Sequence, residues 1–240
     1  MDADVQQQDD AERDSSSGPV TAGRSSRSCS ARLCLGATSL LIVLLLVSAF
    51  VGQPFLIPSA SMTPTLEVGD RVLVNKLAYR FGNSPARGDV VVFDGTGSFR
   101  GEEGADENPV TGLLRAAGSA VGLVRPPETD YVKRVIGVGG DRVRCCDKRG
   151  RIEVNGAPLD EGYLRHGDDP SVVPFDVEVP QGRLWVMGDH RSDSSDSRDH
   201  LGDPGGGTVP VARVIGRADV IGWPVRHWGP VHGAEAGTHG

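Results

Sequence analysis

The sequence predicts a mostly β domain, an antiparallel sheet or partial barrel outside the cytoplasm, that follows one N-terminal transmembrane helix. The first observation is a series of short segments rich in β-branched residues, which turn signals separate. The second is an uncharged apolar stretch, residues 33–51, near the start of the 240-residue chain. The third is that the remainder of the chain contains no sequence repeat and no long helical period.

Residues 1–32 are expected to form a disordered cytoplasmic tail. They are rich in Asp, Gln and Ser and show no apolar period, so they lack the side chains that a packed core needs. Three arginines, Arg24, Arg27 and Arg32, stand at the end of this tail, directly before the apolar stretch.

The stretch 33–51 is long enough to cross a bilayer, because a helix that rises about 1.5 Å per residue covers about 28 Å over this length. The arginines precede it, whereas Glu67 and Asp70 are the first charged residues on its far side. This asymmetry predicts a single-pass anchor in the cell membrane, with the N-terminus in the cytoplasm. A cleaved signal peptide is the alternative, but the long segment before the stretch and the length of the stretch itself disfavour it.

The predicted strands are short runs of β-branched and aromatic residues. The dipeptide Asn155-Gly156 is a hairpin turn signal. The last run reads as one long strand or as two. The expected strands are residues 71–75, 89–93, 131–137, 151–155, 183–189 and 212–223.

Residues 53–225 are expected to form the extracytoplasmic domain, and residues 226–240 a flexible C-terminal tail. Within the domain, residues 94–130 are expected to form a variable loop that begins with Gly, Glu and Asp. Its later part, residues 110–124, is apolar but too short and glycine-rich to span a membrane. This part is either a surface loop with a short helix or a patch that lies on the membrane.

The composition argues against nucleic acid as a partner, and we expect none. The formal net charge is −7 and aromatic residues make up 5% of the chain, whereas binding to nucleic acid depends on clustered cations and stacking platforms. No cysteine spacing fits zinc, and the Asp-rich run 188–198 does not fit a calcium loop, so we expect no metal and no cofactor. Cys145 and Cys146 are expected to be free thiols, with a vicinal disulfide as the alternative.

Three segments carry residues with chemical potential. Residues 57–66, IPSASMTPTL, hold hydroxyl groups between two prolines, although a polar stalk would have the same composition. In residues 131–137, YVKRVIG, alternation places Lys133 on one face with Tyr131 and Val135. Burial there would favour a neutral amine that can act as a general base, whereas a lysine at a strand edge would reach into water instead. Residues 188–198, GDHRSDSSDSR, predict a loop in which Asp and Arg are bonded to one another.

In this order after one anchor, IPSASMTPTL, GDVVVF (88–93), YVKRVIGVGGDRV (131–143) and GDHRSDSSDSR resemble the bacterial type I signal peptidases. The resemblance runs from about residue 55 to residue 223. The Arg-rich composition of the chain is similar to that of actinobacterial members. It implies a serine endopeptidase with a Ser/Lys dyad. Such an enzyme removes N-terminal signal peptides from exported preproteins, through an acyl-enzyme intermediate and after small residues at −3 and −1.

The resemblance also implies a role for individual residues. Ser61 matches the nucleophile and Lys133 the general base. Ser59 matches the hydroxyl that forms the oxyanion hole together with the backbone N–H of Ser61. Ser194 matches the serine that orients the lysine.

Further positions match supporting and substrate-binding residues. The resemblance implies one ion pair between Asp196 and Arg198 and a second between Asp189 and Arg134. His190 stands where many relatives have Asn, a difference that we expect to be without consequence. The positions that match the lining of the substrate pockets are Ile57, Met62, Leu66, Tyr131 and Val132.

The expected partners are preproteins that emerge from the export machinery, together with the lipid bilayer. Two other functions compete with this prediction. One is a self-cleaving Ser/Lys protease of the kind found in bacterial repressors, but such proteins are cytosolic and carry DNA-binding domains. The other is a non-catalytic anchored domain for adhesion or scaffolding, in which Ser61→Ala and Lys133→Ala would leave preprotein cleavage unaffected.

Overall fold

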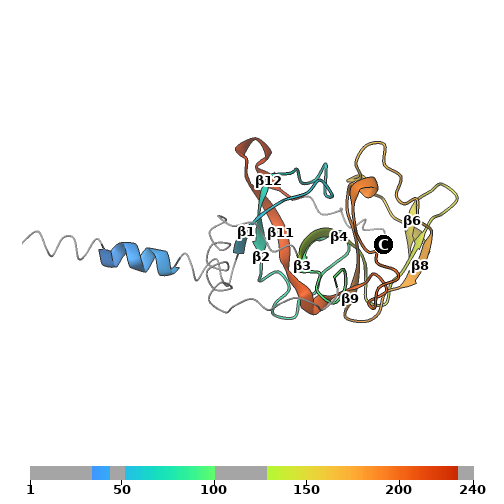
Figure 1. Ribbon diagram of the computed structural model, residues 1–240, viewed down its shortest axis with the longest axis horizontal. Coiled ribbons are helices and arrows are strands. Elements are labelled where there is room, and N and C mark those ends of the chain that lie inside the picture. The colour runs from blue at the N-terminus through green and yellow to red at the C-terminus, as the bar shows by residue number, and fades with distance from the viewer. Residues whose placement is uncertain (1–33, 44–51, 101–128, 232–240) are drawn as a thin grey trace, which may run out of the picture. The chain divides into compact units, whose positions relative to one another are not determined.

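The computed structural model describes residues 34–43, 52–100 and 129–231 (Figure 1). The chain divides into two compact units, residues 1–41 and 42–240. Residues 34–43 form an exposed helix, whereas the predicted tail 1–32 and the rest of the predicted anchor 33–51 lie outside the described residues. Over the described parts of the chain, no helix has the length and apolar character needed to cross a membrane.

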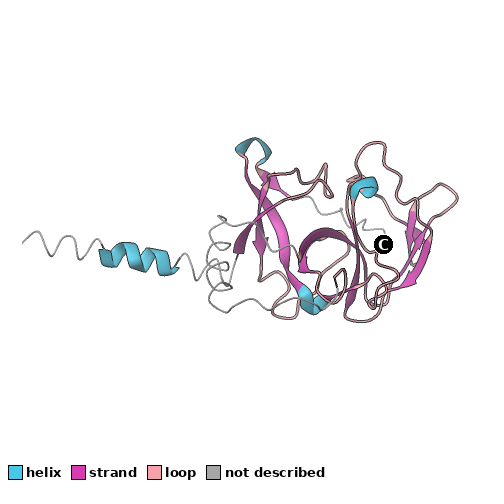
Figure 2. Cartoon of the chain, in the orientation of Figure 1, coloured by secondary structure: helices cyan, strands magenta, loops and turns pink. Residues whose placement is uncertain are grey.

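The second unit is built mainly from strands and loops, as the fold class predicted (Figure 2). Its larger sheet has eight strands in the order β1-β2-β11-β3-β4-β9-β10, with β12 paired to β11. All of these pairings are antiparallel. The strands are β1 (Gly52–Leu56), β2 (Arg71–Asn75), β3 (Val90–Asp94), β4 (Asp130–Val138), β9 (Arg183–Met187), β10 (Val209–Pro210), β11 (Val214–Trp223) and β12 (Gly229–Pro230).

A smaller antiparallel sheet has the order β7-β6-β5-β8. Its strands are β5 (Arg142–Cys145), β6 (Ile152–Val154), β7 (Ala157–Pro158) and β8 (Phe175–Glu178). The predicted turn joins β6 to β7, with positive φ angles of 56° at Asn155 and 80° at Gly156. Asn and Gly tolerate these angles best, which is why this dipeptide closes the hairpin.

Three 3₁₀-helices occur among the described residues of this unit: η1 (Arg191–Asp193), η2 (Val211–Arg213) and η3 (Val225–His227). The run 212–223, which the sequence left as one strand or two, begins in η2 and continues as the single strand β11. Two register shifts interrupt the pairing of β11 with β2, between Ala218 and Val220 and between Ile221 and Trp223.

The core consists of three clusters, and β4 contributes to all of them. Val132 packs with residues of β1, β2, β3, β11 and the segment 57–66. Val135 packs with β3, β9 and β10, and Ile136 packs with the smaller sheet. Figure 1 shows β4 as a curved ribbon between β3 and β9. This position between the clusters buries the middle of the strand, where Lys133 lies.

Three sequence expectations concern particular segments of the chain. Residues 226–231, the start of the expected C-terminal tail, form most of η3 and all of β12, and the N–H of Val231 donates to the Asp219 carbonyl at 2.9 Å. Cys145 and Cys146 are joined by a disulfide across Cα atoms 3.0 Å apart, so the expectation of free thiols is wrong. The segment 110–124 lies outside the described residues.

Candidate active site

The segment that carries Ser61 is held in tight turns between two anchors in the core. Met62 and Leu66 are fully buried, and the N–H of Leu66 donates to the Met62 carbonyl at 2.9 Å. The N–H of Thr63 donates to the Ala60 carbonyl at 3.0 Å. Ser61 lies between the buried side chains of Ile57 and Met62, which hold this turn in place and give the Ser61 side chain a defined direction. Ser61 itself is 7% exposed.

Lys133 reaches Ser61 from the middle of β4. Its Nζ lies 2.7 Å from the Oγ of Ser61, and the lysine is 4% exposed. Burial lowers the pKa of Lys133 to about 8, against the opposing attraction of Asp196 and Asp189. Removing an ammonium group from water disfavours its charged form, so this lysine releases its proton far more readily than an ordinary lysine does.

Ser59 lies at the rim of this pair. Its Oγ is 3.3 Å from the Oγ of Ser61, and the residue is exposed. A hydroxyl in this position can donate to an oxygen atom that arrives next to Ser61. The Ser61 hydroxyl therefore has a buried amine and an accessible hydroxyl donor, each within hydrogen-bond reach of its Oγ.

The loop after β9 surrounds the carboxylate of Asp196. Arg198 donates to both carboxylate oxygens, at 2.9 and 2.8 Å. The N–H of Gly188 and the hydroxyl of Ser194 also donate to Asp196, at 3.0 and 2.9 Å. Ser194 thus directs its proton to Asp196, and the orienting role that the resemblance implies for Ser194 stays a prediction.

The second ion pair is fully buried. Arg134 donates to Asp189 from Nε at 2.8 Å and from Nη2 at 2.6 Å, and neither side chain is exposed to solvent. Arg134 also donates to the Gly88 carbonyl at 2.8 Å, and its guanidinium lies 4.1 Å from the centre of the Tyr163 ring. The hydroxyl of Thr65 donates to Asp189 at 2.5 Å. The pair therefore ties β4 to the loop after β9 and to the segment that carries Ser61.

Four of the five predicted substrate-binding residues lie together, in the core cluster beside Ser61: Ile57, Met62, Leu66 and Val132. Tyr131 lies elsewhere, stacked on Phe93 with ring centres 5.7 Å apart. Neighbouring residues of a strand point to opposite sides. Tyr131 and Val132 therefore reach different clusters, and the structure does not bring Tyr131 to the other four.

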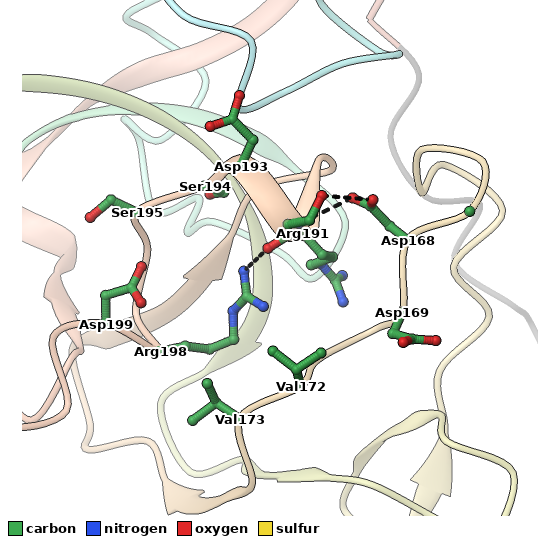
Figure 3. Close-up of a pocket in the computed structure, with 12 residues that line it drawn as sticks. Asp168, Asp169, Val172, Val173, Arg191, Asp193, Ser194, Ser195, Arg198 and Asp199 are labelled. Atoms are coloured by element: carbon green, nitrogen blue, oxygen red, sulfur yellow. Dashed lines mark hydrogen bonds between the residues drawn. The ribbon is translucent and has the colours of Figure 1, made fainter.

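Ser194 and Arg198, the side chains that bond to Asp196, also line a pocket of about 590 Å³ (Figure 3). Residues of 167–173 and 191–199 line it, and none of the five predicted substrate-binding residues does. The hydroxyl of Ser192 donates to Asp168 at 2.8 Å, which links the two segments. Within the ranges that the structure describes, no group of three His, Cys, Asp or Glu side chains could hold a metal ion.

Sequence reasoning missed two features of the site. A Cβ added to Gly188 would lie 2.5 Å from the Ser61 carbonyl oxygen and would also collide with the Ser194 side chain. His190, for which no role was expected, donates its backbone N–H to the Ser61 carbonyl at 3.1 Å. Both residues belong to the GDH start of the segment 188–198, but their contacts are with a segment more than 100 positions earlier in the chain.

Comparison with known proteins gives consistent matches. Residues 31–223 match the family described as signal peptidase, peptidase S26. Signal peptidase I of Mycobacterium tuberculosis (strain ATCC 25618 / H37Rv) is 48% identical over 203 residues, which cover 76% of this chain and 68% of that protein. The probable signal peptidase I of Mycobacterium leprae is 46% identical over 210 residues, with 76% and 72% covered. A crystal structure of a signal peptidase I from Enterococcus faecalis V583 matches with a TM-score of 0.35 and 23% identity, over 55% of this chain and 95% of that chain.

Proposed function

Because the chain belongs to the signal peptidase family, peptidase S26, and resembles its actinobacterial members, we propose that it removes N-terminal signal peptides from exported preproteins with a Ser61/Lys133 dyad. The members of this family are serine peptidases, and the chain is one of them.

The contact between Ser61 and Lys133 is the observation that carries the proposal. A serine hydroxyl is a weak nucleophile that needs a base within hydrogen-bond reach. The 2.7 Å separation provides that reach, and the lowered pKa of about 8 provides a neutral amine at mildly alkaline pH. In the reactive form the hydrogen bond is reversed, and the Ser61 hydroxyl donates to the lone pair of Lys133.

Acylation then follows from the positions of these groups. Lys133 takes the proton from Ser61 as Oγ attacks the carbonyl carbon of the scissile bond. The carbonyl oxygen becomes negative, and the hydroxyl of Ser59 and the backbone N–H of Ser61 are the proposed donors to it. Each such donor is worth about 3 kcal/mol of transition-state stabilisation. Lys133 passes its proton to the leaving amine, which departs as the new N-terminus of the mature protein.

Deacylation uses the same groups with water as the nucleophile. Lys133, neutral again, takes a proton from water as the water oxygen attacks the ester of Ser61. The ester C–O bond breaks and Ser61 recovers its proton from Lys133. The two ion pairs, Asp196 with Arg198 and Asp189 with Arg134, hold the surrounding loops, and their contribution is proposed to be one of support.

The proposed preference is for small residues at −3 and −1 of the preprotein. It is supported by the apolar cluster beside Ser61, in which Ile57, Met62 and Leu66 are all buried and fill the space. Val132, at 7% exposure, is the member of the cluster on β4. Walls of this kind leave shallow hollows that suit Ala, Gly or Ser. Tyr131, packed in another cluster, has no part in this proposal.

We also propose that residues 1–32 are cytoplasmic, that 33–51 anchor the chain, and that the domain 53–225 works at the outer surface of the bilayer. Exposed apolar side chains support this placement: Trp228 is 72% exposed and Trp223 is 55% exposed. His227, next to Trp228, contacts Asp70 at 3.1 Å, and the Asp70 carbonyl accepts from the N–H of Ile57. These side chains therefore lie close to the start of the segment that carries Ser61.

The test is cleavage, in detergent, of a preprotein with Ala at −3 and −1. The unmodified protein should cut it at one position, and Ser61→Ala and Lys133→Ala should each abolish cutting. The control is Asp176→Asn, a change in an exposed ion pair of the smaller sheet. If both active-site variants cleave normally, the dyad is wrong. If the unmodified protein leaves this preprotein uncut, the substrate proposal is wrong.

A further inference from the structure

His190 contacts the turn that carries Ser61 through both its backbone and its side chain. The backbone N–H donates to the Ser61 carbonyl at 3.1 Å. The imidazole Nδ1 lies 3.3 Å from the Ala60 carbonyl oxygen and 3.2 Å from the Oγ1 of Thr63. His190 is buried, so water does not compete strongly for these contacts.

The guanidinium of Arg165 determines which nitrogen of the imidazole carries the proton. The Nη1 atom of Arg165 is 3.4 Å from the Nδ1 of His190 and lies closer to its Nε2. Arginine has donors and no acceptor, so Nε2 must accept. A neutral imidazole that accepts at Nε2 carries its proton on Nδ1, and that proton faces the Ala60 carbonyl and Thr63.

Arg165 is itself held next to His190 by the backbone. Its N–H donates to the Asp189 carbonyl at 3.1 Å, so the segment 159–170 and the start of the loop after β9 are bonded at this point. Thr63 donates its hydroxyl to the Ala60 carbonyl at 2.9 Å, which leaves a lone pair on Oγ1 available to Nδ1–H. Each group at the imidazole therefore has a consistent donor or acceptor role.

We propose that His190 is a positioning residue for Ser61. The Nδ1–H of His190, which Arg165 fixes, and its backbone N–H together hold the turn 60–63. In this position the Oγ of Ser61 faces the Nζ of Lys133. This inference rests on the proposed function, because it assigns His190 an effect on the nucleophile of that reaction. It differs from the expectation that a histidine at this position is without consequence. The effect belongs to the chemical step, because His190 bonds to the turn of the nucleophile and is not a member of the apolar cluster proposed to bind substrate.

Two variants separate the two ends of the imidazole. In His190→Asn the amide nitrogen takes the place of Nδ1 and can donate to Ala60, but the side chain is too short to meet Arg165. In His190→Gln the amide takes the place of Nε2, so it can accept from Arg165 but leaves Ala60 without its donor. His166→Asn, at an exposed histidine next to Arg165, is the matched control.

The experiment measures kcat and KM for a peptide substrate with the full-length chain in detergent. His190→Gln and His190→Ala should lower kcat by about 10 to 100-fold, since small displacements of a reacting atom have effects of this size. KM should change by less than about twofold, because the proposed substrate cluster is untouched. His190→Asn should restore kcat to within about threefold of the parent protein, and His166→Asn should match the parent.

Three outcomes would overturn the inference: kcat unchanged in both His190→Gln and His190→Ala, a loss confined to KM, or a more active Gln than Asn variant. If His190→Ala does not fold, as its melting curve would show, the comparison of Asn with Gln still decides. Ser61→Ala gives a separate answer. If that variant remains active, the proposed function fails, whereas a dead Ser61→Ala with unaffected His190 variants rejects this inference alone.

A second readout tests the proton position directly. In a protein labelled with ¹⁵N in histidine, the resonances that His190→Asn removes should show a protonated Nδ1 and an unprotonated Nε2. Arg165→Met should abolish this preference, because the donor that occupies Nε2 is gone. A protonated Nε2 in the parent protein would overturn the assignment.

Discussion

The Oγ atom of Ser61 and the Nζ atom of Lys133 lie 2.7 Å apart, although 72 positions separate the two residues in the chain. Ser61 is placed by a tight turn whose neighbours are buried, and Lys133 by the middle of a strand that contributes to all three core clusters. The same packing that brings the two atoms together also removes water from the amine. Position and lowered pKa therefore have one physical origin.

Activity should rise as the pH increases through the pKa of Lys133. Only the neutral amine can accept the proton of Ser61, and its pKa is about 8. Below that pH, kcat/KM should fall by about tenfold per pH unit, as expected for a base that must be unprotonated. Lys133→Arg should be inactive at every pH at which the protein is folded, because a guanidinium does not lose its proton in this range. An active Lys133→Arg variant would exclude lysine as the base.

Asp189→Asn should destabilise the protein strongly. It removes the negative charge that faces Arg134 in a site without solvent exposure, and breaking such a pair costs about 3–5 kcal/mol. Urea unfolding followed by circular dichroism measures the change. Asp176→Asn is the control, because its pair with Arg142 lies at the surface and should contribute little. Equal losses in the two variants would contradict the supporting role of the buried pair.

Gly188→Ala should lower kcat by about 10 to 100-fold, because the new methyl group would displace the Ser61 carbonyl or the side chain of Ser194. Gly202→Ala is the matched control, since no atom lies within 4 Å of its added Cβ. Melting curves and peptide hydrolysis for both variants give the comparison. Full activity in Gly188→Ala would mean that this contact does not position the nucleophile.

Val132→Ala should widen the range of residues accepted at −1 or −3. The shorter side chain deepens the hollow on β4, and one methylene in an apolar pocket is worth about 1–3 kcal/mol of discrimination. Competition between peptides with Ala and Val at the tested position measures the ratio of their kcat/KM values. Tyr131→Ala should leave that ratio unchanged, because Tyr131 packs against Phe93 instead. Unchanged preferences in Val132→Ala would remove this residue from the proposed pocket.

Each of the strands that sequence patterns predicted well contributes buried apolar side chains to the core. The run 71–75 matches β2 at both ends, and 131–137 lies within β4. The strands that were missed have weaker signals. β1 contains a proline. Two of the four residues of β5 are arginines, and their side chains form ion pairs with carboxylates on neighbouring strands instead of packing in the core. Such strands are fixed by pairing with distant segments, which local composition does not reveal.

The candidate site shows the same division. The residue types around Ser61 and Lys133 are visible in the sequence, and the resemblance assigned them roles. Gly188 and His190 contact backbone atoms of the turn 60–63. Every residue has these backbone atoms, so the residue types in the turn do not predict such contacts. Tyr131 and Val132, which the resemblance assigned to substrate pockets, pack in different clusters, and the substrate-binding role of Tyr131 stays a prediction. The bond between Cys145 and Cys146 likewise depends on a local backbone arrangement that adjacency alone does not imply.

The most direct test of the central claim is the pKa of Lys133 in the folded protein. The chain has three lysines, Lys76, Lys133 and Lys148, so a sample labelled with ¹³C at the lysine ε-carbon gives few resonances. The resonance that Lys133→Met removes identifies the residue. We expect this resonance to titrate at about pH 8. A titration near the ordinary lysine value of about 10.4 would contradict this expectation, because Lys133 would then stay charged even at mildly alkaline pH and could not accept the proton of Ser61.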